Sequence, residues 1–155
     1  MKSKQPNSRH CFVCGVENPI GLHLKFYETG PGEVTADITL PDKYQGYPGI
    51  AHGGVIAAML DEAAGRAHMG PPDTPRFMFT AKLDVRYHKN VPIGQPLCLV
   101  GKAGLSKRRT AEACSAIYDQ EGVLLADAEL LLVNVPEKVI QSTDLAALGW
   151  KVYPD

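Results

Sequence analysis

Apolar and polar residues alternate along several runs of the chain, a pattern typical of strands that bury one face. Two such runs flank the turn sequence Gly30-Pro31-Gly32 and form an expected hairpin. Four more runs follow residue 76, separated by short turns. The expected strands are residues 22–28, 34–40, 77–89, 97–105, 110–119 and 123–135.

Residues 54–68 have a different pattern and predict one long helix, because they are rich in Ala, Met and Leu and contain no proline. A loop over residues 41–51 leads into this helix, and Gly70-Pro71-Pro72 ends it. A second, short helix is expected around residues 144–148.

Strands joined by short turns predict an antiparallel sheet. One helix cannot cover both faces, so we expect an α+β fold in which a curved sheet wraps around the helix. The outer face is then solvated or paired with a second copy. We expect residues 1–10 to be a flexible N-terminal tail, 11–136 the domain and 137–155 a C-terminal extension.

The charge and hydropathy of the chain argue against nucleic-acid binding, membrane insertion and secretion. The net charge of −1 gives no electrostatic support for a nucleic-acid partner. No apolar run is long enough to cross a membrane, and residues 1–10 do not resemble a secretory signal. We therefore expect a cytoplasmic protein with neither a nucleic-acid nor a membrane partner.

The four cysteines are expected to be reduced thiols in a chain without an export signal: Cys11, Cys14, Cys98 and Cys114. Cys11-x-x-Cys14 could be half of a zinc site, but the other two cysteines lie far apart in predicted strands. Two nearby histidines do not have the spacing of a common zinc finger. A turn with small buried thiols is favoured, and no metal or cofactor is expected.

Asp61 lies about two turns into the predicted helix, at a position where helix propensity and burial both favour a different residue type. Its helical neighbours are three, four and seven residues away, and all except His68 are small. Another chain or a ligand can therefore approach Asp61 closely, as catalysis requires. The alternative is that Asp61 and Glu62 are simply solvated.

His52-Gly53-Gly54 opens the helix. Glycine lets a ligand approach the free N–H groups of the first turn, a natural site for an oxyanion. The alternative is that the two glycines only form a tight turn. His52 could act as a base, although a role in holding the loop by hydrogen bonds is favoured.

Two weaker candidates follow the helix. The Thr80 hydroxyl could orient a water, although Thr is also common in strands; its neighbours Phe77, Phe79, Ala81 and Leu83 are expected to supply core. The second is the basic turn Lys107-Arg108-Arg109. Such a turn is usually solvated, but a phosphate-bearing ligand would make it functional.

Three segments in this order resemble the hotdog-fold thioesterase superfamily, and within it the PaaI-like acyl-CoA thioesterases. They are His52-Gly53-Gly54 with Asp61, the run Phe79–Tyr87, and Cys11–Gly15 followed by Asn18–Leu22. The resemblance covers roughly residues 11–135. It implies a hotdog fold, homodimers that often pair into tetramers, and an active site at the subunit interface.

The resemblance also implies roles for individual residues. Gly53 N–H would polarise the thioester carbonyl, Asp61 would act as general base or nucleophile, and Thr80 would assist the water. In many members the glycine of one subunit faces the aspartate of the other. Some members carry an Asn at the position of Gly46, so the adjacent Gln45 is a candidate substitute.

The expected function is hydrolysis of an acyl-CoA thioester to a free acid and CoA. Candidate catalytic residues are Asp61, Gly53, Thr80 and His52, and candidate substrate-binding residues are Gly54, Gln45, Lys107, Arg108 and Arg109. The alternatives are a non-catalytic acyl-CoA sensor and a hydratase or dehydratase on the same fold.

Overall fold

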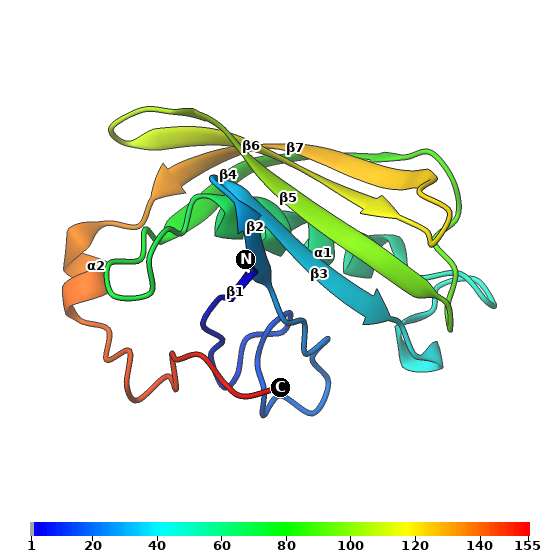
Figure 1. The fold of residues 1–155 in the computed structure, drawn as a ribbon, viewed down its shortest axis with the longest axis horizontal. Helices are drawn as coiled ribbons and strands as arrows, with labels where there is room; N and C mark the ends of the chain where they lie inside the picture. The colour runs from blue at the N-terminus through cyan, green and yellow to red at the C-terminus, as the bar shows by residue number, and fades with distance from the viewer. Residues whose placement is uncertain (1) are drawn as a thin grey trace.

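In residues 2–155, which the computed structural model describes, seven strands form one antiparallel sheet that curves over a long helix (Figure 1). Their order across the sheet is β1-β2-β3-β5-β6-β7-β4. The strands are β1 Ser3–Lys4, β2 Tyr27–Gly30, β3 Glu33–Thr39, β4 Met78–Tyr87, β5 Pro96–Ser106, β6 Thr110–Tyr118 and β7 Leu124–Asn134. The helices are the 3-10 turn η1 Asp42–Tyr44, α1 Gly53–Ala67 and α2 Glu137–Gln141.

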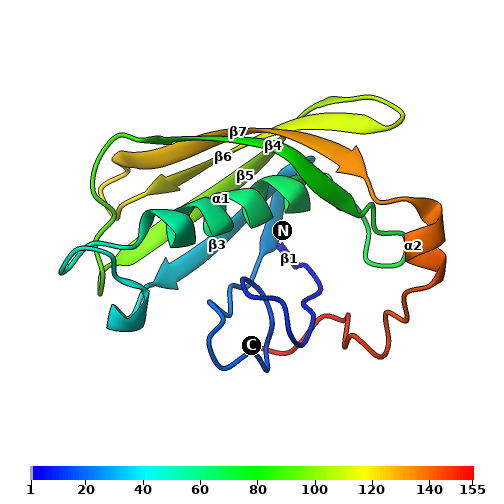
Figure 2. The same cartoon turned by 180° about the vertical axis from the view of Figure 1, so that it is seen from behind.

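Helix α1 packs directly on β5 and β6. A Cβ at Gly101 in β5 would lie 2.1 Å from the carbonyl oxygen of Ala63, so only glycine permits this approach. On β6, the buried Ser115 hydroxyl donates to the carbonyl oxygen of Leu60 at 2.7 Å. These two contacts fix the height of the helix over the sheet. Figure 2 shows α1 lying along the sheet.

The predicted α+β architecture and the order of hairpin, helix and four strands are confirmed. Residues 22–26 are an exception, because β2 begins only at Tyr27. Leu22 and Leu24 are buried, but their N–H groups donate to the carbonyls of Phe12 and Val13. Their alternating burial therefore comes from pairing with an N-terminal loop instead of the sheet.

The predicted flexible tail is wrong for residues 2–10, and Met1 lies outside the described residues. Strand β1 extends the sheet by pairing with β2. Asn7 is only 3% exposed, and its side chain donates to the carbonyl oxygen of Cys14 at 2.9 Å. Buried Arg66 donates to the carbonyl oxygen of Pro6 at 2.8 Å. The polar side chains that suggested disorder are thus used in internal hydrogen bonds.

The C-terminal segment also differs from the prediction. Asp144 accepts hydrogen bonds from the N–H groups of Ala146 and Ala147, but Gly149, with a φ of 67°, ends the segment after one turn. The second helix is α2 instead. The chain then returns to the N-terminal segment on the helix side of the sheet, where Lys151 pairs with Asn7 (Figures 1 and 2).

Among residues 2–155, no helix combines the length and apolar character needed to cross a bilayer.

Candidate active site

Asp61 and Thr80 lie side by side at the edge of the sheet. The Thr80 hydroxyl donates to Asp61 Oδ1 at 2.5 Å. Both residues face a cavity of about 220 Å³ between the helix, β4 and the two terminal segments. The cavity is lined by Ser8, Cys11, Cys14, Asp61, Glu62, Gly65, Arg66, Met69, Arg76, Phe77, Met78, Thr80 and Trp150. The structure thus brings together two residues that were predicted separately.

A β-bulge at Ala81 turns Thr80 toward the helix. Thr80 pairs with the buried Leu132, whereas Lys82 pairs with the next residue, the exposed Leu131. This extra residue reverses the alternation on either side of it. Phe79, expected in the core, consequently faces outward and is 52% exposed. Bulges of this kind often re-aim side chains beside active sites.

The surroundings of Asp61 make its carboxylate a stronger base. Partial burial raises the pKa of Asp61 above its ordinary value, and the hydrogen bond from Thr80 opposes this shift. The neighbouring negative charge of Glu62 raises the pKa further. A carboxylate with a raised pKa is better suited to take a proton from water.

The helix N-terminus is built as the sequence indicates. His52 is the N-cap, and its Nδ1 accepts the Gly54 N–H at 2.9 Å, which supports the structural role favoured for this histidine. Within residues 2–155 the Gly53 N–H has no acceptor. Tyr87 Oη donates to the Gly53 carbonyl oxygen at 2.7 Å, an anchor that the sequence did not single out.

Gly53 and Asp61 are far apart within one chain. Eight residues at the helical rise of 1.5 Å separate them by about 12 Å along the axis. A single thioester carbonyl cannot contact both groups of the same chain. If both act on one substrate, two chains must contribute to the site.

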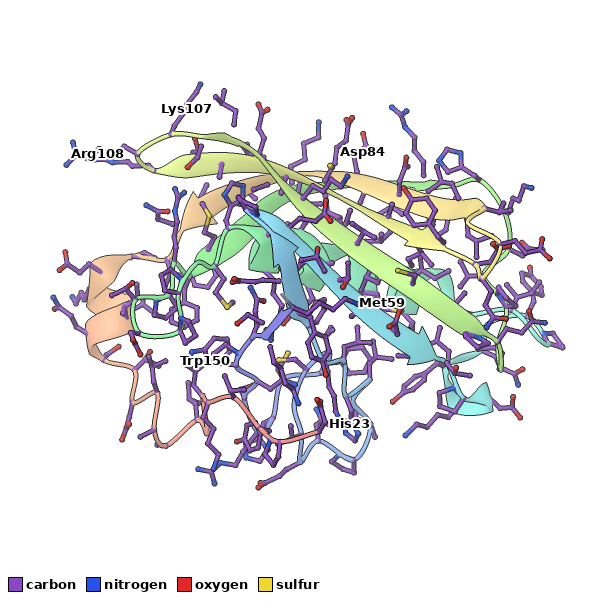
Figure 3. All side chains as sticks on the ribbon, in the orientation of Figure 1. His23, Met59, Asp84, Lys107, Arg108 and Trp150 are labelled. Atoms are coloured by element: carbon purple, nitrogen blue, oxygen red, sulfur yellow. The ribbon has the colours of Figure 1, made fainter. Side chains whose placement is uncertain are left out.

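The other predicted binding residues lie outside this cavity. Gln45 is exposed and uses Oε1 to accept the Gly49 N–H of its own loop. Figure 3 shows Lys107 and Arg108 at the tip of the β5–β6 turn, pointing away from the molecule. Arg76 connects this turn to the cavity, because it lines the cavity and donates to the Lys107 carbonyl oxygen at 3.0 Å.

A cysteine pair lies in the same cavity and was not expected there. Hydrogen bonding to Cys14 lowers the pKa of Cys11 to about 6, although burial opposes this shift. The same hydrogen bond, together with burial, raises the pKa of Cys14. Glu62 and the fully buried Arg66 complete the cluster, with Arg66 Nε 2.9 Å from Glu62 Oε1.

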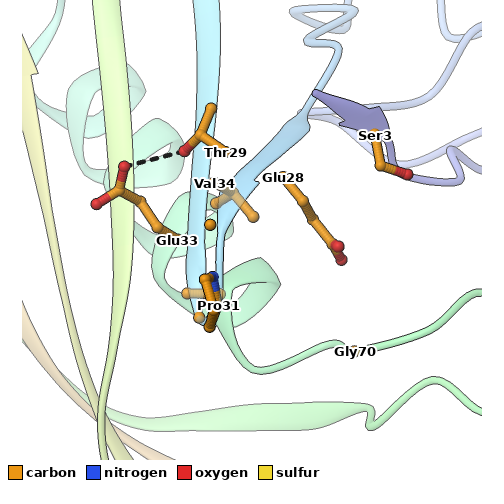
Figure 4. A pocket seen from close by; sticks show the side chains of 10 residues that line it. Ser3, Glu28, Thr29, Pro31, Glu33, Val34 and Gly70 are labelled. Atoms are coloured by element: carbon orange, nitrogen blue, oxygen red, sulfur yellow. Dashed lines mark hydrogen bonds between the residues drawn. The ribbon is translucent and has the colours of Figure 1, made fainter. Parts of the chain in front are cut away.

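Another cavity, of about 440 Å³, lies beside the β2–β3 turn (Figure 4). Glu28 and Glu33 line it, and Glu33 accepts a hydrogen bond from Thr29 at 2.9 Å. Two carboxylates disfavour an anionic ligand such as CoA. None of the predicted catalytic residues lines this cavity, so the cavity at Asp61 is the better candidate.

Comparison with known proteins agrees with this geometry. The family model described as "Thioesterase superfamily" matches residues 48–126 of the 155, a stretch that contains α1 and β4. Acyl-coenzyme A thioesterase THEM4 of Bos taurus is 26% identical over 130 residues. That alignment covers 82% of this chain and 52% of THEM4, so the chain spans about half the length of this curated relative.

Solved structures show the same fold. A thioesterase superfamily protein has a TM-score of 0.74 and 34% identity, covering 81% of this chain and 63% of that one. A Streptococcus mutans protein bound to acetyl CoA has a TM-score of 0.65 and 22% identity, covering 72% and 88%. The Escherichia coli PaaI protein has a TM-score of 0.66 and 13% identity, covering 74% and 81%.

The predicted resemblance is therefore confirmed: this chain belongs to the thioesterase superfamily and has its hotdog fold.

Proposed function

We propose that this protein is an acyl-CoA thioesterase that hydrolyses its substrate to a free acid and CoA. The observation that carries the proposal is the Asp61 carboxylate, which is hydrogen-bonded to Thr80 and faces a cavity in a thioesterase-superfamily fold. Asp61 takes a proton from water as the water attacks the thioester carbonyl, or attacks the carbonyl carbon itself. In the first route the C–S bond then breaks, the proton passes from Asp61 to the sulfur, and CoA leaves as its thiol. In the second route CoA leaves as the thiolate from an acyl–Asp61 anhydride, and water hydrolyses the anhydride to the free acid and supplies the proton that the thiolate takes.

Charge that develops on the carbonyl oxygen is stabilised by the Gly53 N–H. This donor is free within the described chain and lies at the positive end of α1. Because Gly53 and Asp61 of one chain are too far apart, we place the Gly53 of one subunit opposite the Asp61 of another. The active site then belongs to a homodimer.

Strand β4 supports such a dimer. It is an edge strand of ten residues, and its exposed side chains include the aromatic residues Phe79 and Tyr87. A long unprotected edge of this kind is a template for pairing with another chain. Thr80 and Tyr87 lie on this strand, next to Asp61 and Gly53 respectively. Pairing along β4 therefore brings the two halves of the site to one interface.

The basic turn Lys107-Arg108-Arg109 is assigned to the phosphates of CoA, since guanidinium groups recognise phosphate well. The Streptococcus mutans structure bound to acetyl CoA supports this class of ligand. A non-catalytic acyl-CoA sensor would have no need of a half-buried carboxylate paired with a hydroxyl. A hydratase would add water to enoyl-CoA without releasing thiol, so assaying both reactions separates the two enzymes.

Replacing Gly53 with proline tests the proposed oxyanion donor. Gly53 is the first residue of the helix, a position that tolerates proline, so the substitution removes the N–H and keeps the helix. We expect the release of free thiol from acyl-CoA to slow by roughly 10²–10³-fold in kcat, the usual effect of losing one such donor. Short, long and aromatic acyl-CoAs should be assayed to find the acyl chain that the cavity accepts.

Gly53→Ala is the matched control, because it keeps the N–H. Its Cβ would lie 3.5 Å from Tyr87 Oη, an ordinary contact, so near-normal turnover is expected. Equal losses in the two variants would contradict the role of the N–H. If the wild-type protein bound acyl-CoA but released no thiol, the sensor alternative would be correct.

A further inference from the structure

Three potential metal ligands from two distant parts of the chain meet beside Asp61. The Sγ atoms of Cys11 and Cys14 and a carboxylate oxygen of Glu62 all lie within 4.8 Å of one another. Thiolate and carboxylate are both common ligands of zinc, which takes four ligands in a tetrahedral arrangement. Glu62, which the helix supplies, is the partner that the Cys-x-x-Cys spacing lacked.

The turn over residues 11–15 is shaped to hold a thiolate. The N–H groups of Val13 and Cys14 point at Cys11 Sγ, at 3.3 and 3.4 Å. The turn closes with the Gly15 N–H donating to the Cys11 carbonyl oxygen at 2.8 Å. A Cβ at Gly15 would lie 2.3 Å from that oxygen, so only glycine fits directly after the second cysteine.

Arg66 supplies the second layer of the cluster. Its Nε donates to Glu62 at 2.9 Å and so orients the carboxylate, as outer partners of metal ligands commonly do. The Arg66 side chain is only 1% exposed, and its Nη2 has no acceptor in the described chain. A buried unpaired guanidinium N–H is costly, and a thiolate or carboxylate here would supply an acceptor.

The charges of the cluster also balance around a divalent ion. Two thiolates and the Glu62 carboxylate carry three negative charges, which one divalent cation and the Arg66 guanidinium neutralise.

We propose that Cys11, Cys14 and Glu62 bind one zinc ion, with the fourth coordination position open to the cavity at Asp61. The ion would fasten the N-terminal segment to α1, because its ligands come from both. This proposal does not rest on the proposed thioesterase activity, and its tests read out metal binding instead of turnover.

The test is metal analysis of protein produced in zinc-supplemented medium and purified without chelators. We expect about one zinc per chain, and replacement with Co²⁺ should give the intense near-ultraviolet absorption of cobalt–thiolate bonds. Cys11→Ser and Cys14→Ser should lose most of the zinc and this absorption. Cys98→Ser is the matched control and should retain both, since Cys98 lies in β5 on another part of the sheet.

A second measurement uses the unmodified chain, in case a serine variant fails to fold. Alkylation followed by mass spectrometry should show Cys11 and Cys14 protected when zinc is present and labelled after chelation. Labelling of Cys98 and Cys114 should not respond to zinc. The proposal would be overturned if the protein is isolated without zinc and each of its four thiols is alkylated to the same extent with and without added zinc. Isolation of a Cys11–Cys14 disulfide that excludes zinc would overturn it too.

Discussion

The Asp61→Asn variant is expected to lose between about 10²- and 10⁴-fold in kcat for acyl-CoA hydrolysis, the range that a positioned general base contributes. Asparagine has nearly the same shape and keeps an oxygen that can accept the Thr80 hydroxyl. The fold and the oligomer should therefore persist. Thiol release measures the loss, and thermal unfolding and sedimentation check that the protein is otherwise unchanged.

Asp73→Asn is the control for this substitution, because Asp73 is an exposed carboxylate in the loop after α1. Its turnover should match the wild type. Near wild-type hydrolysis by Asp61→Asn would remove Asp61 from the chemistry. Unfolding would also lower the turnover of a variant, so kcat is compared only between variants that thermal unfolding shows to be folded.

The Arg66→Met variant is expected to be less stable by about 3–5 kcal/mol, the usual result of removing one partner of a buried ion pair. Glu62 would lose its cation, and Pro6 and Gln5 would lose a buried hydrogen-bond donor. The guanidinium also lies over the ring of Phe26, 4.6 Å from its centre. In a domain of this size the midpoint of thermal unfolding should fall by roughly 6–20 °C.

Arg108→Met is the matched control, because the Arg108 side chain is exposed at the tip of a turn. Its midpoint should stay within about 1–2 °C of the wild type, as for most surface substitutions. Limited proteolysis should also cut residues 5–9 faster in Arg66→Met, since Arg66 holds this segment. Equal stability of the two variants would mean that the buried arginine does not anchor the N-terminal segment.

Much of the fold could be predicted because period-2 and helical patterns report which face of an element is buried. The helix and the strands after it were found within a few residues of their observed bounds. Residues 22–26 show the limit of this approach. Their alternation reports burial correctly, but the partner is the loop at Phe12 and Val13, a contact that no local pattern reveals.

The candidate site was predicted in part. Asp61 stood out as a carboxylate among small helical neighbours, and the resemblance strengthened Thr80, which was only a weak candidate by itself. The hydrogen bond between Thr80 and Asp61 depends on the bulge at Ala81, which shifts the register of β4 against β7. No sequence pattern indicates this bulge. The burial of Arg66 was missed because an arginine in a helix normally reaches solvent.

The convergence of Cys11, Cys14 and Glu62 was missed for a related reason. The two cysteines and the glutamate are separated by about fifty residues, and only the packing of the N-terminal segment on α1 brings them together. Further ligands were sought only among the other cysteines and the nearby histidines, so no ligand from the helix was considered for the cysteine pair. Long-range packing, and not local propensity, decides such clusters.

The most direct test of an active site shared between subunits is a hybrid of two inactive variants. Asp61→Asn and Gly53→Pro subunits, carrying different tags, are co-expressed and the mixed dimer is isolated. One of its two sites would then join an intact Gly53 to an intact Asp61, so the hybrid should show about half of the wild-type thiol release. A hybrid no more active than either parent variant would contradict the shared site.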